Sequence, residues 1–242
     1  MPLATVEIAP LVIRMAAPLH VGTGYRRGLI HRTIVRDAEN NVYLPASTLK
    51  GKVRAACEAL LTARGLPACR APYPKEMKTC RAERCLVCRI FGAPGQDAGL
   101  LWHDAALTDD WPRDAGEFGQ TSIRTQVALN RARGLAAEGL LYTGEATAPN
   151  LVFRSAQGIA GRLELTPLMG EPDAPYELIL LLAGLRLVRF LGGAASRGMG
   201  LCTIDLPQAV QINNRQVFVD DLLAQVEYLD PEFWQFEEAS HG

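Results

Sequence analysis

Leu44-Pro-Ala-Ser-Thr-Leu-Lys-Gly-Lys-Val-Arg54 joins an extended run to a helix. The extended run ends at Pro45, and the hydroxyl of Ser47 or Thr48 can cap the free backbone amides of a first helical turn. Apolar residues then recur at the spacing of one helix face, and Gly65 and Pro67 follow as stop signals. We therefore predict a helix that starts at Ser47 or Thr48. Its apolar face comprises Leu49, Val53, Ala56, Cys57, Leu60 and Leu61.

The first two turns of this helix carry three cations, Lys50, Lys52 and Arg54. The helix dipole makes its N-terminus an unfavourable place for positive charge, and a bound anion would remove that conflict. Phosphate is a common ligand of free amides at a helix start, and Lys50 and Arg54 lie one turn apart beside them. We predict a phosphate-binding helix start with Ser47 and Thr48; the alternative is a basic face that lies in water.

The chain has 242 residues, of which 48% are hydrophobic, so it can bury a full core, and we expect one domain over residues 1–242 with insertions. Its net charge of −1 hides a division along the chain. Residues 1–90 carry 15 Lys and Arg against 6 Asp and Glu, whereas residues 91–242 carry 10 against 20. This asymmetry fits a subunit that holds a polyanion on one surface and meets other subunits on another, although acidic surface also keeps proteins soluble.

We expect a cytoplasmic protein without a membrane partner. No apolar run reaches the roughly 20 residues of a membrane-spanning helix, and the first residues lack the order of a signal peptide. Cytoplasmic cysteines are usually metal ligands or core residues rather than disulfides.

Four of the six cysteines cluster in the sequence as Cys69, Cys80, Cys85 and Cys88. The Cys-x-x-Cys pair supplies two thiolates from one tight turn, and the other two can complete a tetrahedron around zinc. The surrounding insertion, about residues 66–92, is rich in proline and cations and is unlikely to form a core alone, which favours a structural metal. Free or redox-active cysteines are the alternative. The remaining Cys57 and Cys202 fit buried core positions.

Several segments fit β-strands. Residues 6–16 and 99–107 each read as one strand, residues 151–154 and 161–166 as a strand or strand pair, and residues 201–206 as a final strand.

Residues 19–28 form a glycine-containing loop in which Arg26 and Arg27 supply charge. Residues 29–36 and 41–45 flank a polar turn and predict a hairpin that brings His31, Arg32 and Arg36 near the helix start.

Residues 121–142 predict a second hairpin, with arms at 121–129 and 139–142 and a polar tip at 130–138 that carries Arg131 and Arg133. Such a composition suits an arm that projects from the body, and it also suits an ordinary surface loop.

A second helix is expected from Asp173 to about Leu191, apolar on nearly every side and therefore buried against a sheet. A glycine-rich segment, residues 192–200, follows it. Residues 207–242 read as an acidic tail with a short amphipathic helix near 217–228 and the aromatic residues Phe233, Trp234 and Phe236.

The resulting order is strand, helix, strand, strand, helix, strand. This is the split βαβ plan of an α+β, ferredoxin-like fold, here with a zinc-site insertion and a hairpin insertion. Because this fold serves many functions, function has to be inferred from the sites.

Three motifs in this order resemble the RAMP superfamily of CRISPR-associated proteins, and specifically the repeating backbone subunit of type III effector complexes. Residues 44–54 look like the family's "IPGSSLKGxLR", residues 85–92 (Cys-Leu-Val-Cys-Arg-Ile-Phe-Gly) like "CPVCxLFG", and residues 191–200 like its glycine-rich loop. The resemblance spans about residues 6–206. It implies a modified RNA-recognition fold that binds the backbone of guide (CRISPR) RNA, with a thumb hairpin at about residues 125–142 that kinks the guide.

This resemblance implies target RNA and the other subunits of a type III complex as further partners. Contacts to phosphate, sugar and shape are expected to dominate, because the subunit must accept any guide sequence. The expected RNA contacts are Arg26, Arg27, Arg36, Ser47, Thr48, Lys50, Lys52, Arg54, Arg131, Arg133, Gly192, Gly193, Ser196, Arg197 and Gly198.

The sequence departs from the target-cleaving members at one position. Their loop has an Asp about six residues before the Arg-Asp that here is Arg36-Asp37, and the matching position is His31. Because the family's metal-assisted cut depends on that carboxylate, we expect a subunit that binds without cutting. The alternatives are a Mg²⁺-dependent endoribonuclease that uses His31 or Asp37, and a stand-alone zinc-stapled RNA-binding protein outside CRISPR.

Overall fold

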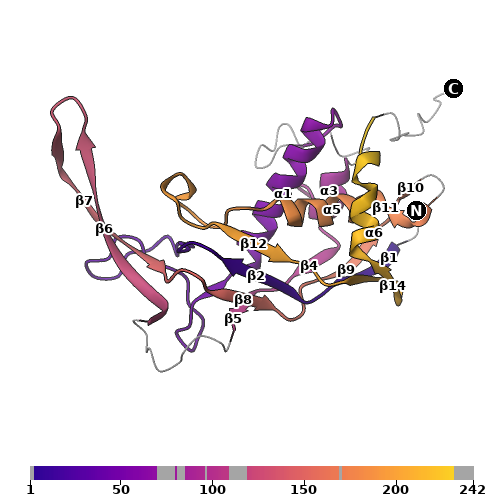
Figure 1. Cartoon of the computed structure of the whole chain (residues 1–242), viewed down its shortest axis with the longest axis horizontal. Coiled ribbons are helices and arrows are strands. Elements are labelled where there is room, and N and C mark those ends of the chain that lie inside the picture. Colours follow the sequence, from indigo (N-terminus) through magenta and orange to yellow (C-terminus); the bar gives the residue numbers. More distant parts are fainter. Residues whose placement is uncertain are drawn as a thin grey trace.

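The computed structural model describes residues 3–69, 80, 85–95, 97–108, 119–168 and 171–231. It has mixed α+β architecture: a body of sheets covered on one side by helices, and a long β-hairpin that leaves the body (Figure 1). The four longer helical elements are α1 (Ala46–Ala63), α3 (Leu86–Phe91), α5 (Tyr176–Leu187) and α6 (Val219–Ala224). The strands are β1 (Leu3–Ile8), β2 (Leu11–Met15), β3 (Tyr43–Leu44), β4 (Leu100–Trp102), β5 (Ala105–Leu107), β6 (Thr121–Asn130), β7 (Leu135–Thr147), β8 (Val152–Ser155), β9 (Ile159–Glu164), β10 (Pro167–Leu168), β11 (Glu171–Pro175), β12 (Cys202–Asp205), β13 (Ala209–Ile212) and β14 (Arg215–Phe218).

The body contains two five-stranded antiparallel sheets. The hairpin-side sheet has the order β12-β2-β8-β5-β3, and the distal sheet has the order β14-β13-β1-β9-β4. Four chain segments each give one strand to both sheets: β1 with β2, β4 with β5, β8 with β9, and β12 with β13. The single strands expected over residues 6–16 and 99–107 are therefore wrong. Each segment bends out of one sheet and into the other, at Ala9-Pro10 and at His103-Asp104.

The hairpin-side sheet confirms the ferredoxin-like plan. The elements β2, α1, β5, β8, α5 and β12 follow one another as strand, helix, strand, strand, helix, strand. In space the order of the four strands is β12-β2-β8-β5, with the first strand beside the third and all neighbours antiparallel. The distal sheet repeats this order as β13-β1-β9-β4.

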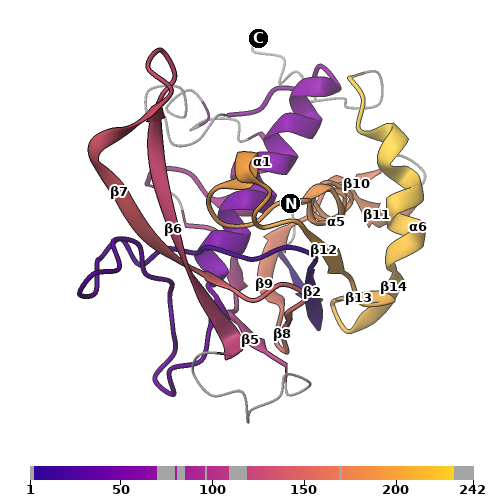
Figure 2. The ribbon, with the colours of Figure 1, turned by 60° about the vertical axis from the view of Figure 1, so that its left-hand side comes forward.

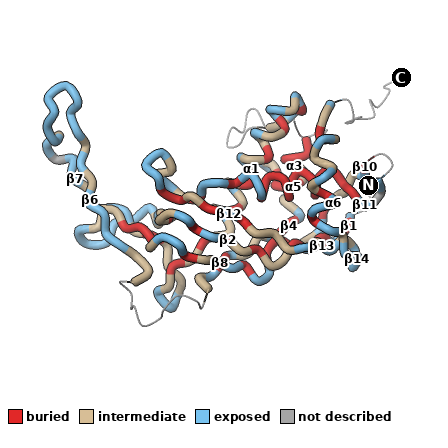
Figure 3. The backbone as a smooth tube through the Cα atoms, viewed as in Figure 1, coloured by how far each residue is buried: buried red, intermediate tan, exposed pale blue. Residues whose placement is uncertain are grey.

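Helix α5 forms the centre of the helical layer and contacts α1, α3 and α6. All residues from Tyr176 to Leu185 are buried, which confirms the expected burial (red tube in Figure 3). The expected ends are wrong: Asp173 lies in β11, which pairs with β10, and the helix ends at Leu187. The proline at position 175 lies at the N-cap, where its missing N–H costs nothing.

Helices α1 and α5 approach closely at Gly184. A Cβ atom at this position would lie 2.3 Å from the sulfur of Cys57 and 3.4 Å from Cγ1 of Val53. Both side chains belong to the buried face of α1 together with Leu49 and Leu61. The glycine therefore sets the spacing of the two helices.

We predict that Gly184→Ala lowers the free energy of unfolding by about 1–3 kcal/mol through overpacking. The matched control is Gly51→Ala in α1, where a Cβ atom meets nothing within 4 Å. It should raise stability by up to about 1 kcal/mol through helix propensity. Urea unfolding of both variants measures the effect, and equal midpoints would contradict the close packing.

Strands β6 and β7 form the projecting hairpin and pair from Thr121↔Thr147 to Asn130↔Leu135, with one irregularity between Val127 and Leu129. Its outer part is exposed (Figure 3). The tip is shorter than expected because β7 already begins at Leu135. Only residues 131–134 turn, which keeps Arg131 and Arg133 at the end of the arm.

Residues 29–45 do not form the expected regular hairpin. Apart from the single bridge Arg36↔Val42, the backbone of residues 30–35 pairs elsewhere. The amides of His31 and Arg32 donate to the Thr143 carbonyl of β7, and the Val35 amide donates to the Val21 carbonyl. This segment therefore connects the hairpin base to the body.

The segment expected as an acidic tail is structured through residue 231. Residues 209–218 form β13 and β14, which complete the distal sheet. The amphipathic helix expected near residues 217–228 is confirmed as α6 and the 3₁₀ turn η4 (Gln225–Tyr228). Phe233, Trp234 and Phe236 lie outside the described residues. In the part of the chain that is described, no helix has the length and apolar character needed to cross a membrane.

Candidate nucleic-acid interface and metal centre

Helix α1 begins at Ala46 with Pro45 as its N-cap, and neither Ser47 nor Thr48 makes a capping hydrogen bond. The predicted cap is therefore wrong. Instead the Ala46 amide donates to Oδ1 of Asp104, at 2.7 Å, from the crossing between β4 and β5. A carboxylate at a helix N-terminus is favoured by the dipole. Part of the electrostatic conflict at this helix start is thus resolved by an anion within the chain.

Lys50 and Lys52 remain available at the helix start, and the structure describes no ion pair for either. Partial burial lowers the pKa of Lys50, and the positive charge of Arg54 lowers it further. Burial raises the pKa of the Cys202 thiol to about 11, against the opposing positive charges of Arg189 and Lys52. Lys52 therefore lies near Cys202 of β12 and near Arg189, which follows the end of α5 where the chain turns into the glycine-rich loop.

Arg54 is turned away from this surface. Its Nε donates to Glu58 at 2.9 Å and its Nη1 to the Gly92 carbonyl at 3.0 Å. The geometry separates Arg54 from the two lysines with which the sequence grouped it.

The glycine-rich loop packs on residues 18–20. A Cβ atom at Gly192, whose φ is +69°, would lie 2.4 Å from the carbonyl oxygen of His20. The Gly193 amide donates to the same oxygen at 2.8 Å. These two glycines permit contact within the protein. Gly198 differs, because its φ is +76° and a Cβ atom there would meet nothing within 4 Å, so it leaves room for a ligand beside the exposed Ser196 and Arg197.

The glycine-rich loop and the root of the hairpin lie beside each other in Figures 1 and 2. A cleft separates the two segments. Arg32, Arg124 and Arg197 all line it. Arg197 donates to the Tyr142 hydroxyl at 2.9 Å and to Oε1 of Gln126. The guanidinium carbon of Arg32 lies 5.2 Å from the centre of the Tyr142 ring. We call this site the arginine cleft.

The three guanidinium groups of the arginine cleft lack acidic partners. Within the described ranges, the arginines in ion pairs are Arg14, Arg36, Arg54 and Arg89. Glu145 also lines the cleft, but its Oε1 pairs with Arg36 at 2.6 Å and its Oε2 accepts the Ile34 amide. Converging cations without counter-charge favour a bound anion.

Arg32 and Arg124 are not among the RNA contacts expected from the sequence. Arg32 was expected only near the helix start, whereas it pairs with Gly144 of β7. Arg124 lies in β6 with no sequence motif around it. Only the register of the hairpin places both of them opposite Arg197.

The other predicted cations are dispersed. Arg36 donates to Glu145, to Thr121 and to the Asn40 carbonyl, so it anchors the hairpin base. Arg27 and Arg36 line a second, open cavity of about 830 Å³ beside the hairpin base. Arg26 is exposed in the adjoining loop, and Arg131 and Arg133 are exposed at the hairpin tip.

His31 lies at the hairpin root, where the Thr143 amide donates to its Nδ1 at 3.1 Å. The same Nδ1 also lies 3.1 Å from the hydroxyl oxygen of Thr143, which donates its own proton to the Leu29 carbonyl. Asp37 accepts the Asn41 amide with Oδ1 at 2.7 Å and so closes a turn. Both side chains serve the local backbone.

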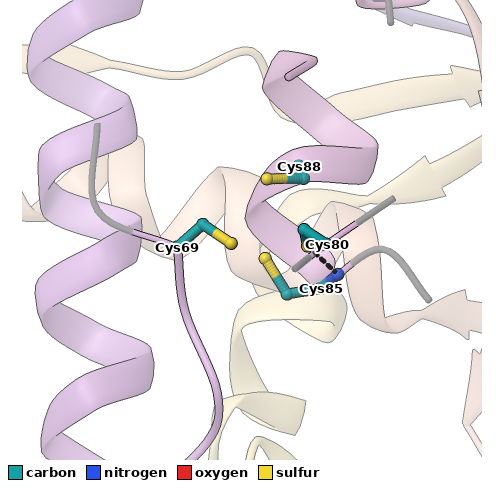
Figure 4. Close-up of side chains that lie close together, drawn as sticks. All are labelled: Cys69, Cys80, Cys85 and Cys88. Atoms are coloured by element: carbon teal, nitrogen blue, oxygen red, sulfur yellow. Dashed lines mark hydrogen bonds between the residues drawn. The ribbon is translucent and has the colours of Figure 1, made fainter. Parts of the chain in front are cut away.

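The four predicted cysteines lie together, and their sulfur atoms are all within 4.8 Å of one another (Figure 4). Cys69 follows α1, Cys85 is the N-cap of α3, and Cys88 lies in its first turn. Cys80 accepts the Cys85 amide at 3.1 Å. Four thiolates around zinc, with Zn–S bonds of about 2.3 Å, would lie roughly 3.8 Å apart, so the set fits a structural metal after a small contraction. Cys57 and Cys202 are buried, as predicted.

The protonation of the cluster also favours a metal. A hydrogen bond from Cys88 lowers the pKa of Cys85 to about 5. Burial raises the pKa of Cys69 to about 12, and the shared proton raises the pKa of Cys88 as well. A divalent ion would stabilise the thiolate form of all four ligands.

Comparison with protein-family models gives a match over most of the chain. The model of the RAMP superfamily matches residues 13–203, about four fifths of the chain. No curated protein matches the sequence.

Proposed function

We propose that this chain, which belongs to the RAMP superfamily of CRISPR-associated proteins, is a guide-RNA-binding structural subunit of a type III interference complex. Membership of the superfamily implies a CRISPR RNA-binding protein. The finer proposal is that it holds the backbone of the guide for target recognition and does not cut.

The arginine cleft is the observation that carries this proposal. Arg32, Arg124 and Arg197 come from three separate segments, line one cleft and have no acidic partner among the described residues. A phosphodiester supplies the missing negative charge and accepts several N–H donors at once. The cleft lies between the glycine-rich loop and the hairpin root. These two segments lie side by side in Figure 2, so a polynucleotide can leave the body along the hairpin.

Lys50, Lys52 and the open face of Gly198 extend this surface. Lysine binds phosphate as a point charge, and a glycine without neighbours lets a sugar–phosphate backbone approach closely. Contacts of these groups to phosphate and sugar carry no sequence information. Binding should therefore be independent of sequence and sensitive to salt.

The proposal that the subunit does not cut rests on His31. Its Nδ1 contacts both the amide and the hydroxyl of Thr143, and an imidazole lacks the negative charge of a carboxylate for holding a metal ion. Mg²⁺ prefers oxygen ligands to imidazole nitrogen. The nearby Glu145 uses both of its oxygens within the protein.

The test is purification of the complex that contains this chain, followed by sizing of its RNA and incubation with a guide-matched target and Mg²⁺. We expect one guide of defined length and no cut opposite this subunit, in wild type and in His31→Ala. His31→Asp restores a carboxylate and should gain Mg²⁺-dependent cutting, which makes it the positive control.

Two results would overturn the proposal. Wild-type cutting opposite this subunit that disappears in His31→Ala would make His31 catalytic and the chain an endoribonuclease. Co-purification of mixed cellular RNA without a discrete guide would point to a stand-alone RNA-binding protein.

A further inference from the structure

We infer that Arg54 is an outer-sphere partner of the four-cysteine metal site and ties that site to α1, rather than a ligand of RNA. The inference goes beyond the proposed function, because it concerns the metal site and holds whether or not the chain binds a guide. It starts from one side chain that is only 15% exposed.

All three guanidinium nitrogens of Arg54 point inward. Nε donates to Oε1 of Glu58 at 2.9 Å, and Nη1 donates to the Gly92 carbonyl at 3.0 Å. Nη2 lies 4.0 Å from the sulfur of Cys88, at the outer limit of a hydrogen bond to sulfur. The guanidinium group of Arg54 thus connects Glu58 of its own helix, the C-terminal end of α3 and the thiol of Cys88.

The chemistry of the cluster explains this arrangement. A divalent ion with four thiolates carries a net charge of −2, and such a site needs cations or N–H donors around its sulfur atoms. Metal binding would also strengthen the hydrogen bond from Nη2 of Arg54 to the sulfur of Cys88, because a thiolate is a stronger acceptor than a thiol. Arg54 is thus the described cation placed to offset the charge on Cys88.

The geometry also orients the two helices. The Gly92 carbonyl lies at the C-terminal end of α3, where the helix dipole favours a cation. Glu58, one turn after Arg54, holds the guanidinium plane in position. The side chain of Arg54 therefore links the metal-binding cysteines of α3 to α1, the helix that carries Lys50 and Lys52.

A phosphate would compete poorly for this group. To reach RNA, Arg54 would have to give up its contact to Glu58 and leave the carbonyl of the buried Gly92 without this donor. An unsatisfied buried polar group is expensive. Lys50 and Lys52 can bind phosphate without such a loss.

The test uses Arg54→Gln and Arg54→Lys in the full chain. Loss of an outer-sphere partner typically weakens metal binding 10- to 100-fold. We therefore expect zinc affinity, measured by competition with a chromophoric chelator, to fall by about that factor in Arg54→Gln, and less in Arg54→Lys. Arg64→Gln is the matched control, because Arg64 lies at the other end of α1 and donates to the Glu227 carbonyl at 3.3 Å. It should leave zinc affinity unchanged.

A second readout separates a role toward the metal from a general loss of stability. In the Co²⁺-substituted protein, the thiolate-to-cobalt absorption band should shift in Arg54→Gln and remain in place in Arg64→Gln. An RNA titration against salt completes the test. The slope should fall by roughly 0.7 in Lys50→Ala and stay unchanged in metal-loaded Arg54→Gln.

The inference fails if zinc affinity and the cobalt band are unchanged in Arg54→Gln, or if its salt slope falls as it does in Lys50→Ala. If Arg54→Gln does not fold, Glu58→Gln decides. It keeps the guanidinium but removes its orienting carboxylate, so a several-fold loss of zinc affinity supports the inference and an unchanged affinity overturns it. If no variant and no wild-type chain binds RNA, only the proposed function fails.

Discussion

The double variant Cys85→Ser, Cys88→Ser is expected to bind no zinc and to lose on the order of 10 kcal/mol of stability, the free energy that structural zinc supplies to small domains. Such a loss is comparable to the whole stability of an ordinary domain. The cysteines are part of the main core, in which Leu86, Val87 and Ile90 are also buried. The damage should therefore extend beyond the insertion.

Metal analysis of the wild-type chain should find about one zinc per chain. Guanidinium unfolding measures the loss in the variant, and a chelator should reproduce it in wild type. Cys202→Ser is the matched control, because it also places a hydroxyl at a buried cysteine but leaves the four ligands in place. A wild-type chain that contains no metal and is stably folded would show that the four-cysteine prediction is wrong.

The triple variant Arg32→Ala, Arg124→Ala, Arg197→Ala should lower RNA affinity on the order of 100-fold at physiological salt. Each charge-assisted contact is worth roughly 1.5–3 kcal/mol, and three neighbouring contacts give less than their sum. The slope of log affinity against log salt should become shallower by roughly 2, since about 0.7 is lost for each phosphate contact of a single strand. RNAs of different sequence should lose affinity equally.

The control for charge is Arg14→Ala, Arg162→Ala, Arg215→Ala. These three exposed arginines lie on strands of the two sheets, and their removal changes the net charge by the same amount. This control variant should leave the slope of log RNA affinity against log salt nearly unchanged. Equal losses in both triple variants would mean that only the overall charge matters and would remove the arginine cleft from the proposal.

Patterns within one segment of the sequence correctly predicted the buried face of α1 and the cysteine cluster. The apolar spacing after Pro45 identified the buried face of α1, and four of its six expected positions are fully buried: Leu49, Val53, Cys57 and Leu61. The cysteine spacing identified a cluster that the structure brings within 4.8 Å. In both cases the interacting residues are close in sequence or share one motif.

The parts that were missed depend on contacts between distant residues. The N-terminal cap of α1 comes from Asp104, 58 positions after Ala46, and a pattern within one segment cannot contain it. Arg124 lies opposite Gly144 in the register of β6 and β7, and Arg32 reaches the cleft through its bridge to the same Gly144. Residues 6–16 were expected as one strand although Pro10 lies within them, because proline in a strand allows several interpretations.

The four crossings between the two sheets limit how this chain can change in length. Three of them lie against one another: a Cβ atom at Gly158 would be 2.0 Å from the Ile8 carbonyl oxygen, and the His103 amide donates to the Gly158 carbonyl at 3.0 Å. One residue added to a single crossing would shift half of a strand against its neighbours and turn its side chains to the opposite face. Insertions and deletions in relatives should therefore avoid residues 9–10, 103–104, 156–158 and 206–208, and should collect at the hairpin tip and in the loop after Tyr25.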